Sequence, residues 1–283
     1  RSRGLGDVYK RQILDSAGKI TEGEVLFHGQ NLIGKDKKGL RNIRGNKISI
    51  IFQDPMTSLN PVYTIGNQLR EAIKLHTDRK GNAIKERAVE MLRLVGVNDP
   101  EKRIKQYPYQ LSGGMRQRVM IAMALACEPD ILIADEPTTA LDVTIQAQIL
   151  RLMKDLQKTL GMAIIMITHD LGVVATLCQK INIMYGGQIV EHGTTDEIFY
   201  NPKHPYTMGL LRSIGTHTNG ERQSLIPIPG TPPDLLKLNS GCAFMPRCSK
   251  AMKICKDYMP CRTQFSEDQY CSCWEYCKDL SLI

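Results

Sequence analysis

Two short stretches of the sequence contain only apolar residues, and each leads directly into polar ones. Residues 131–134 read Ile-Leu-Ile-Ala and continue into Asp135 and Glu136, and residues 163–167 read Ala-Ile-Ile-Met-Ile and continue into Thr-His-Asp at 168–170. Strands with such continuous apolar runs are covered on both faces, as in a mainly parallel sheet. Because helical patterns lie between the strands, the sequence predicts an α/β fold.

The other expected elements follow from residue periodicity and from turn signals. Gly186 and Gly187 separate two apolar runs and predict a hairpin. Thr194 and Glu197 have the spacing of a capping box and predict the start of a short helix. The expected helices cover 83–95, 113–126 and 148–160, and the expected strands cover 23–27, 47–52, 131–134, 163–167, 181–185 and 188–191.

Length and composition exclude several classes of protein. A chain of 283 residues accommodates one large domain with an appendage or two modest domains, and 42% hydrophobic with 23% charged residues is ordinary for a globular protein. Neither a membrane-spanning apolar stretch nor a secretory signal is visible, so we expect a cytoplasmic chain whose membrane role depends on a partner. The net charge of +8 is spread along the sequence without a nucleic-acid motif, so no nucleic-acid partner is expected.

Two segments carry residues suited to phosphate chemistry. Residues 111–118 read Leu-Ser-Gly-Gly-Met-Arg-Gln-Arg, where Ser112, Gly113 and Gly114 begin an expected helix. Unpaired N–H groups at a helix start bind anions, and glycines allow close approach of the backbone. At the end of the strand 131–134, two adjacent carboxylates can support Mg²⁺ and an attacking water.

In their order and spacing, the segments 111–118, 131–138, 140–142 and 168–170 resemble the motifs of the ATP-binding cassette (ABC) ATPases. The resemblance implies an ABC nucleotide-binding domain with a mainly parallel sheet and a helical subdomain, which binds ATP and Mg²⁺ and hydrolyses ATP.

The resemblance also implies a role for each matching residue. Asp135 supports Mg²⁺ and Glu136 is the general base. Gln53 contacts the metal and water and links the site to membrane subunits. Asp142 matches the D-loop, and His169 steadies the terminal phosphate. Ser112, Gly113 and Gly114 form the signature that faces the nucleotide of the opposite subunit, which implies a dimer.

The phosphate loop of such ATPases is missing from the sequence. No Gly-x-x-x-x-Gly-Lys-Ser/Thr pattern occurs anywhere in the chain. We interpret residues 1–12 as a non-native leader, residues 13–200 as a nucleotide-binding domain that has lost this loop, and residues 201–283 as a C-terminal extension. We therefore expect weak or absent ATPase activity from the chain as it stands.

Other segments are similar to the ATP-binding subunits of dipeptide and oligopeptide importers. They are Gln53-Asp-Pro-Met-Thr-Ser-Leu-Asn-Pro61, His204-Pro-Tyr-Thr207 and Ile228-Pro-Gly-Thr-Pro-Pro233, together with Met115 in the signature. This similarity implies a peripheral subunit at the cytoplasmic face of the membrane that drives peptide uptake. Its expected partners are a second ABC ATPase, identical or not, two membrane permease subunits and an extracytoplasmic peptide-binding protein.

The sequence has nine cysteines, and seven of them follow residue 241. In a cytoplasmic chain such clustering favours metal ligation over disulfides, and thiolates suit iron–sulfur centres or zinc. The resemblance to the importers implies a [4Fe–4S] cluster held by Cys242, Cys248, Cys255 and Cys273, within a small Cys-rich C-terminal extension. Zinc and a set of reduced thiols remain alternatives, and Cys261, Cys271 and Cys277 lie outside the family's pattern.

Alternative functions also stay open. Related importers carry nickel or other solutes, so the transported solute is not fixed by these motifs. A non-transport ABC ATPase acting on nucleic acid or ribosomes is a second class, although it gives no reason for the extension from residue 204 to residue 273. A third is an iron–sulfur electron carrier with a vestigial cassette.

Overall fold

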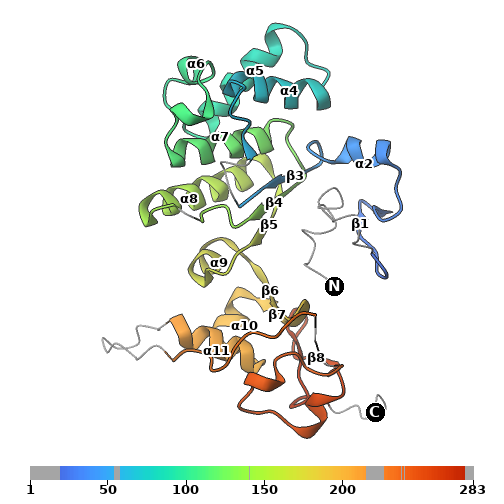
Figure 1. The fold of residues 1–283 in the computed structure, drawn as a ribbon. Coiled ribbons are helices and arrows are strands. Elements are labelled where there is room, and N and C mark those ends of the chain that lie inside the picture. Colours follow the sequence, from blue (N-terminus) through green and yellow to red (C-terminus); the bar gives the residue numbers. More distant parts are fainter. Residues whose placement is uncertain are drawn as a thin grey trace. The chain divides into compact units, whose positions relative to one another are not determined.

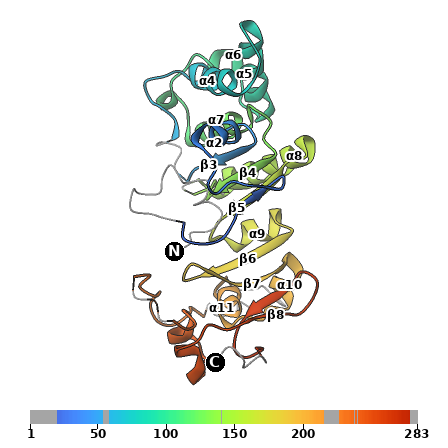
Figure 2. The same ribbon diagram turned by 90° about the vertical axis from the view of Figure 1, so that its right-hand side faces the viewer.

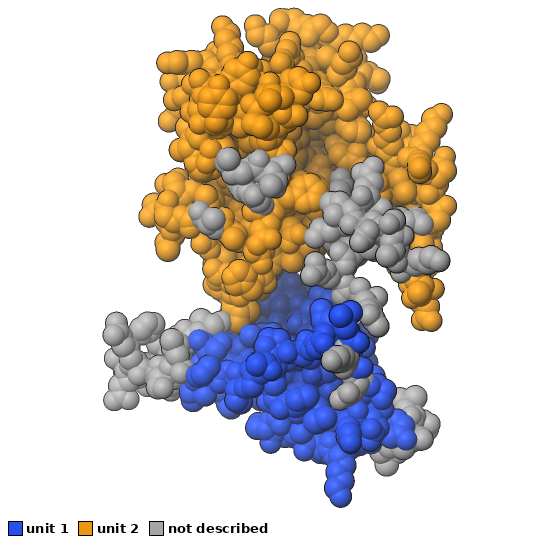
Figure 3. Space-filling model, viewed as in Figure 1, with its two compact units in different colours: residues 1–4, 178–283 blue, residues 5–177 orange. Residues whose placement is uncertain are grey.

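The chain divides into two compact units on either side of the Leu177–Cys178 bond. The fold is that of a computed structural model, which describes residues 20–53, 58–139, 141–214, 226–236, 238 and 240–277. Figure 3 colours the N-terminal unit, which ends at Leu177, differently from the C-terminal unit, which begins at Cys178. The expected leader, residues 1–12, lies outside the described residues, and the expected boundary near residue 200 stays a prediction.

A parallel sheet forms the centre of the N-terminal unit. Its strands lie in the order β3 (Ile48–Ile51), β4 (Ile131–Asp135) and β5 (Ala163–Ile167). The prediction of parallel strands at both apolar runs is therefore confirmed, but only β4 is buried, whereas β5 is half-buried and exposed at both of its ends.

Both faces of this sheet are covered, which explains its continuous apolar strands. Leu132 and Ala134 belong to the main core, and the alternate residues Ile131 and Ile133 belong to a second cluster on the opposite face. The second cluster includes residues of a short hairpin, β1 (Leu26–Phe27) with β2 (Gln30–Asn31), and of α2 (Lys37–Ile43).

Helices of the main core pack together on one side of the sheet. In Figures 1 and 2, α7 (Gly113–Leu125) lies between the sheet and a group of helices, and it contacts β3, α4 and α5. This group consists of α4 (Ile65–His76), α5 (Asn82–Leu94) and α6 (Pro100–Arg103), and it agrees with the expected helical subdomain. Helices α8 (Val143–Leu160) and α9 (Leu171–Leu177) complete the unit.

The C-terminal unit is built on an antiparallel sheet in the order β6–β7–β9–β8. Gly186 and Gly187 have φ angles of +57° and +83°, as the expected tight hairpin requires. The predicted capping box is also confirmed, because the Thr194 and Glu197 side chains bond each other's backbone at the start of α10. The elements of this unit are β6 (Lys180–Tyr185), β7 (Gln188–Thr194), α10 (Thr195–Tyr200), α11 (Pro205–Ile214), β8 (Arg262–Gln264) and β9 (Tyr270–Ser272).

Candidate functional site

Three predicted catalytic residues follow three neighbouring parallel strands. Gln53 comes just after β3, Glu136 directly after β4, and His169 just after β5. The carboxyl ends of parallel strands meet at one edge of a sheet, which is where open α/β folds bind ligands. The topology therefore brings together residues that are far apart in the sequence.

The carboxylate of Glu136 is the centre of this group. Gln53 donates from Nε2 to Glu136 Oε2 at 2.7 Å, and Thr139 donates from its hydroxyl to the same oxygen at 3.0 Å. His169 Nδ1 lies 3.0 Å from Oε1. The His169 side chain is 79% exposed and that of Glu136 is 23% exposed, so the group is open to a ligand.

These contacts keep Glu136 ionised. The hydrogen bond from His169 is the main cause that lowers the pKa of Glu136 from its ordinary value of 4.5. Burial opposes this by raising the pKa, while Thr139, the charge of His169 and Gln53 lower it further. At neutral pH the group is thus a carboxylate that can accept a proton.

The backbone of Glu136 is held in an uncommon conformation. Its φ angle is +47°, in the left-handed region that residues other than glycine rarely adopt. The Glu136 N–H donates to the Ile167 carbonyl at 2.8 Å, and the Thr139 N–H donates to the Glu136 carbonyl at 3.2 Å. Such strain persists where the surrounding contacts fix it, and it is common at functional sites.

A separate set of contacts positions His169. The next residue, Asp170, accepts hydrogen bonds from the N–H groups of Gly172 at 2.8 Å and Val173 at 3.3 Å. Gln146 of α8 donates to the other carboxylate oxygen of Asp170 at 3.0 Å. The loop that carries His169 is thereby tied to both α8 and α9.

The predicted signature lies at the start of α7, as expected. Ser112 is the N-cap and its hydroxyl accepts from the Met115 N–H at 3.4 Å, while Gly113 and Gly114 are the first helical residues. A Cβ placed on Gly114 would lie 3.0 Å from Ile145 Cγ2, so only glycine fits there without a shift. No hydrogen bond among the described residues joins these three residues to the Glu136 carboxylate.

Two residues that support this site were not predicted from the sequence. Gln117 of α7 is 1% exposed and donates from its amide to the Pro137 carbonyl, which fixes α7 to the turn after Glu136. Thr139 donates to Glu136 itself. No signal in the sequence was available for either residue, because Gln117 stands between Arg116 and Arg118 in the polar part of α7 and Thr139 lies in an ordinary turn sequence.

The two predicted aspartates lie at different elements, Asp135 at the end of a strand and Asp142 at the start of a helix. Asp135 is the last residue of β4 and is half-buried. Asp142 is the N-cap of α8, and its side chain accepts from the Ile145 N–H at 2.9 Å. Asp142 therefore has a structural partner, in addition to the role that the resemblance implies.

The predicted metal site in the C-terminal unit is not supported as an assembled centre. Within the part of the chain that the structure describes, no group of three or more His, Cys, Asp or Glu side chains has the geometry to hold a metal ion. However, all four predicted ligands line one small cavity of about 10 Å³. Burial raises the pKa of the thiols of Cys242, Cys248, Cys271 and Cys273, the last to about 11.

The expectation that favours metal ligation over disulfides does not hold for one pair of the C-terminal cysteines. Cys261 and Cys277 form a disulfide with a Cα–Cα distance of 5.7 Å. Composition could not distinguish this pair, because seven cysteines in one short segment can pair in many ways.

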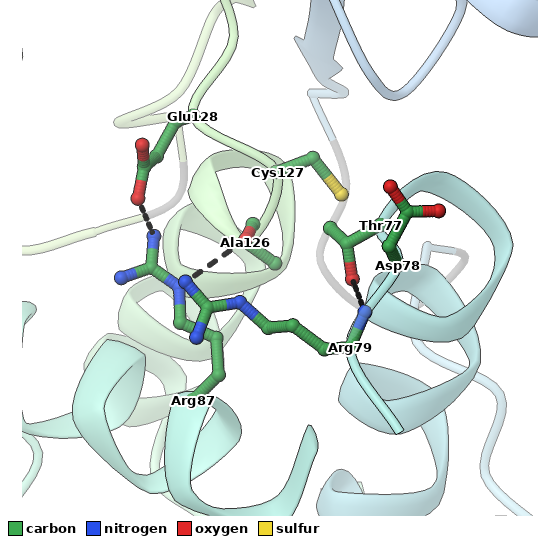
Figure 4. A pocket seen from close by; sticks show the side chains of 7 residues that line it. All are labelled: Thr77, Asp78, Arg79, Arg87, Ala126, Cys127 and Glu128. Atoms are coloured by element: carbon green, nitrogen blue, oxygen red, sulfur yellow. Dashed lines mark hydrogen bonds and ion pairs between the residues drawn. The ribbon is translucent and has the colours of Figure 1, made fainter. Parts of the chain in front are cut away.

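The N-terminal unit has a further cavity of about 490 Å³, shown in Figure 4. Its walls come from the segment after α4, from α5 and from the segment after α7. Arg87 donates to Glu128 Oε1 at 2.7 Å and to the Ala126 carbonyl at 3.4 Å. The Arg79 side chain extends toward Arg87 in this view. None of the predicted site residues lines this cavity.

Comparison with protein families identifies both parts of the chain. Residues 12–139 match the family described as ABC transporter, and residues 190–255 match the oligopeptide/dipeptide transporter C-terminal region. The site and fold thus define an ABC ATPase, for which ATP and Mg²⁺ are the expected ligands.

Similar proteins agree with this assignment to the ABC ATPases. The oligopeptide transport ATP-binding protein OppD of Bacillus subtilis is 55% identical over 91% of this chain and 72% of its own length. The dipeptide transport ATP-binding protein DppD of the same organism is 52% identical over 91% of this chain and 77% of its own. The chain belongs to the family of peptide ABC transporter ATP-binding proteins.

Solved structures confirm the cassette fold. A dimeric ATP-binding cassette in a post-hydrolysis state with ADP and Pi is 31% identical, with a TM-score of 0.56 over 62% of this chain and 74% of that one. Within the described residues, no helix is both long and apolar enough to cross a membrane.

Proposed function

We propose that this chain is the ATP-hydrolysing motor subunit of an importer for dipeptides or oligopeptides, at the cytoplasmic face of the membrane. The observation that carries the proposal is the convergence of Gln53, Thr139 and His169 on the Glu136 carboxylate at the ends of parallel strands. The match of residues 190–255 to the peptide-transporter C-terminal region supports peptides as the transported solute.

In this proposal, Glu136 accepts a proton from the attacking water. Its lowered pKa favours the ionised form that this role needs, and proton transfer of this kind contributes about 10²–10⁴-fold to rate. Gln53 and His169 hold the carboxylate, and His169 Nε2 has no partner among the described residues, so it is available to the terminal phosphate.

The expected magnesium ion fits the carboxylates at this edge of the sheet. Asp135 ends β4 and supplies the hard oxygen ligand that Mg²⁺ prefers, directly or through water. When bound with ATP, Mg²⁺ neutralises phosphate charge.

We further propose that two ATPase subunits enclose the nucleotide. Ser112, Gly113 and Gly114 lie at the start of α7, where N–H groups lack a partner within the helix, and no bond among the described residues joins them to Glu136. They are therefore available to a phosphate held by the other subunit. Asp142 lies beside this contact as the cap of α8. The partner subunit is identical or a related ATPase.

We propose that the 490 Å³ cavity receives a cytoplasmic segment of a permease subunit that carries a carboxylate. Arg87 is neutralised by Glu90 at 3.0 Å and Glu128 at 2.7 Å. The exposed Arg79 guanidinium has no hydrogen-bond or ion-pair partner among the described residues, so it is available to an acidic group.

Copurification with the two permease subunits tests this docking site. Arg79→Asp is expected to reduce the amount of recovered complex at least tenfold, which corresponds to a loss of about 1.4 kcal/mol of binding free energy. Lys85→Asp, an equal charge change at an exposed position of α5, is the matched control. Equal recovery of both variants would exclude the cavity as the docking site.

The catalytic proposal is tested by ATP turnover with and without a phosphate loop. We expect weak or no turnover by the chain as it stands and clear turnover by a version with an added Gly-x-x-x-x-Gly-Lys-Ser segment. The reconstituted transporter should then take up labelled peptide in competition with unlabelled peptide but not with nickel. Equal turnover with and without the loop would refute the first expectation, and nickel uptake would refute peptide as the solute.

We also propose that the four thiols of the C-terminal unit hold a soft metal centre, a [4Fe–4S] cluster by resemblance. The donor type fits, since Cys242, Cys248, Cys255 and Cys273 line one cavity, but a space of about 10 Å³ holds about one water, so the walls must open for a cluster. Iron and sulfide analysis of anaerobically purified protein tests this. Colourless, iron-free protein with four reactive thiols would exclude it.

A further inference from the structure

The disulfide between Cys261 and Cys277 joins two parts of the C-terminal unit that are 16 residues apart in the sequence. The Cα–Cα distance of 5.7 Å lies in the range that a disulfide spans without moving the backbone. Neither cysteine belongs to the set proposed for metal binding. The pair therefore needs an explanation of its own.

Both ends of the disulfide adjoin the wall of the four-thiol cavity. Pro260, which precedes Cys261, lines the cavity, and so do Cys273 and Trp274. The Cys277 N–H donates to the Cys273 carbonyl at 3.2 Å, so these two cysteines lie on one turn. The bond thus ties the turn that carries Cys273 to the segment at Pro260.

One cysteine of the pair, Cys277, is buried, and the other, Cys261, can be reached from solvent. Cys277 is 9% exposed and packs in one cluster with Trp274 and Cys255. Cys261 is half-buried. A small oxidant or reductant can therefore approach the pair through Cys261, whereas opening the turn exposes the apolar cluster.

We propose that Cys261 and Cys277 are a site of reversible thiol–disulfide chemistry that clamps Cys273 in the cavity wall. The oxidant is a small disulfide of the glutathione type. The two cysteine thiols lose two protons and two electrons and form the S–S bond, while the S–S bond of the oxidant breaks and yields two thiols. A dithiol reverses the step. The clamp requires no ATP hydrolysis.

Redox titration of the folded full chain tests the chemistry. The protein is equilibrated with defined ratios of reduced and oxidised glutathione, quenched with acid, alkylated and analysed by peptide mass spectrometry. We expect a linked Cys261–Cys277 peptide to appear and disappear reversibly with the ratio, while the other seven cysteines stay alkylated. Two persistent thiols in the most oxidising buffer, a bond that the folded chain never loses, or pairing with Cys271 or Cys273 would overturn the proposal.

The clamping effect has its own measurement, the alkylation rate of Cys273. We expect this rate to be about tenfold lower in the oxidised chain than in the reduced one, which corresponds to about 1.4 kcal/mol in the free energy of exposing Cys273. Cys127 of the N-terminal unit is the internal reference and should react at one rate in both buffers. In the Cys261→Ser, Cys277→Ser double variant the difference should vanish; if that variant does not fold, the two buffers applied to the native chain still decide. Equal Cys273 rates in the two buffers would disprove the clamp.

Discussion

A single carboxylate organises the chemistry of the N-terminal unit. Glu136 accepts three hydrogen bonds when His169 carries its proton on Nδ1, and it does so from a left-handed backbone conformation. The sequence motifs predicted Gln53, Glu136 and His169, because strand ends in a parallel sheet converge. They could not predict Thr139, since a hydroxyl in a turn gives no signal of where it points.

The pKa of Glu136 depends on His169, and this gives a prediction at the scale of one residue. The pKa of the folded carboxyl lies below its ordinary value of 4.5, so its interactions stabilise the fold above that pH and are lost as the pH falls through the lowered pKa. His169→Ala removes the largest cause of the lowering, so the pKa should rise. Carbon-13 NMR titration measures it, with Glu136→Gln to assign the signal. A pKa that stays unchanged would show that the hydrogen bond is not formed in solution.

At the scale of elements, patterns located most strands and the helices α5, α7, α8 and α10, but they missed α2, α4, α6, α9 and α11 and the start of α8. Helix α8 begins at Val143, five residues before the expected start at Gln148, because Asp142 caps it ahead of the first apolar periodic residue. The tail strand β9 pairs with β7, which no local pattern indicates because pairing partners so far apart are chosen by tertiary packing.

The bond between Gln117 and the Pro137 carbonyl is expected to stabilise the N-terminal unit. Gln117→Leu leaves a buried carbonyl without its donor, which costs about 1–3 kcal/mol. Urea unfolding measures the loss. Gln148→Leu, on the exposed side of α8, is the control and should change the free energy of unfolding by less than about 0.5 kcal/mol. A Gln117→Leu variant as stable as this control would contradict the structural role of the bond.

At the scale of the whole molecule, the chain combines an ABC cassette with the C-terminal region of peptide transporters. The motifs predicted this combination and grouped the four cysteines that line one cavity in the structure, but not the cavity itself. They did not predict the disulfide, because cysteine spacing alone does not determine which thiols lie within bonding distance.

Nucleotide-dependent pairing of two chains is the prediction at this scale. Gly113→Asp places a negative charge at the helix start proposed to meet a phosphate of the other subunit. An acidic residue in the first turn favours the helix, and a Cβ at Gly113 meets only Leu141 at 3.9 Å, so the variant should fold normally. With ATP and a phosphate loop present, the parent should sediment as a dimer and the variant as a monomer. A dimeric variant would contradict the proposed contact.

ATP turnover by the Glu136→Gln variant tests the central claim most directly. In a chain that carries a phosphate loop, the substitution keeps the size of the side chain but replaces one acceptor oxygen with an amide NH2 and removes the group that accepts the proton. The account predicts that the variant binds ATP as tightly as the parent and hydrolyses it about 10²–10⁴-fold more slowly in a single turnover. Hydrolysis at the parent's rate would show that the Glu136 carboxylate is not the base.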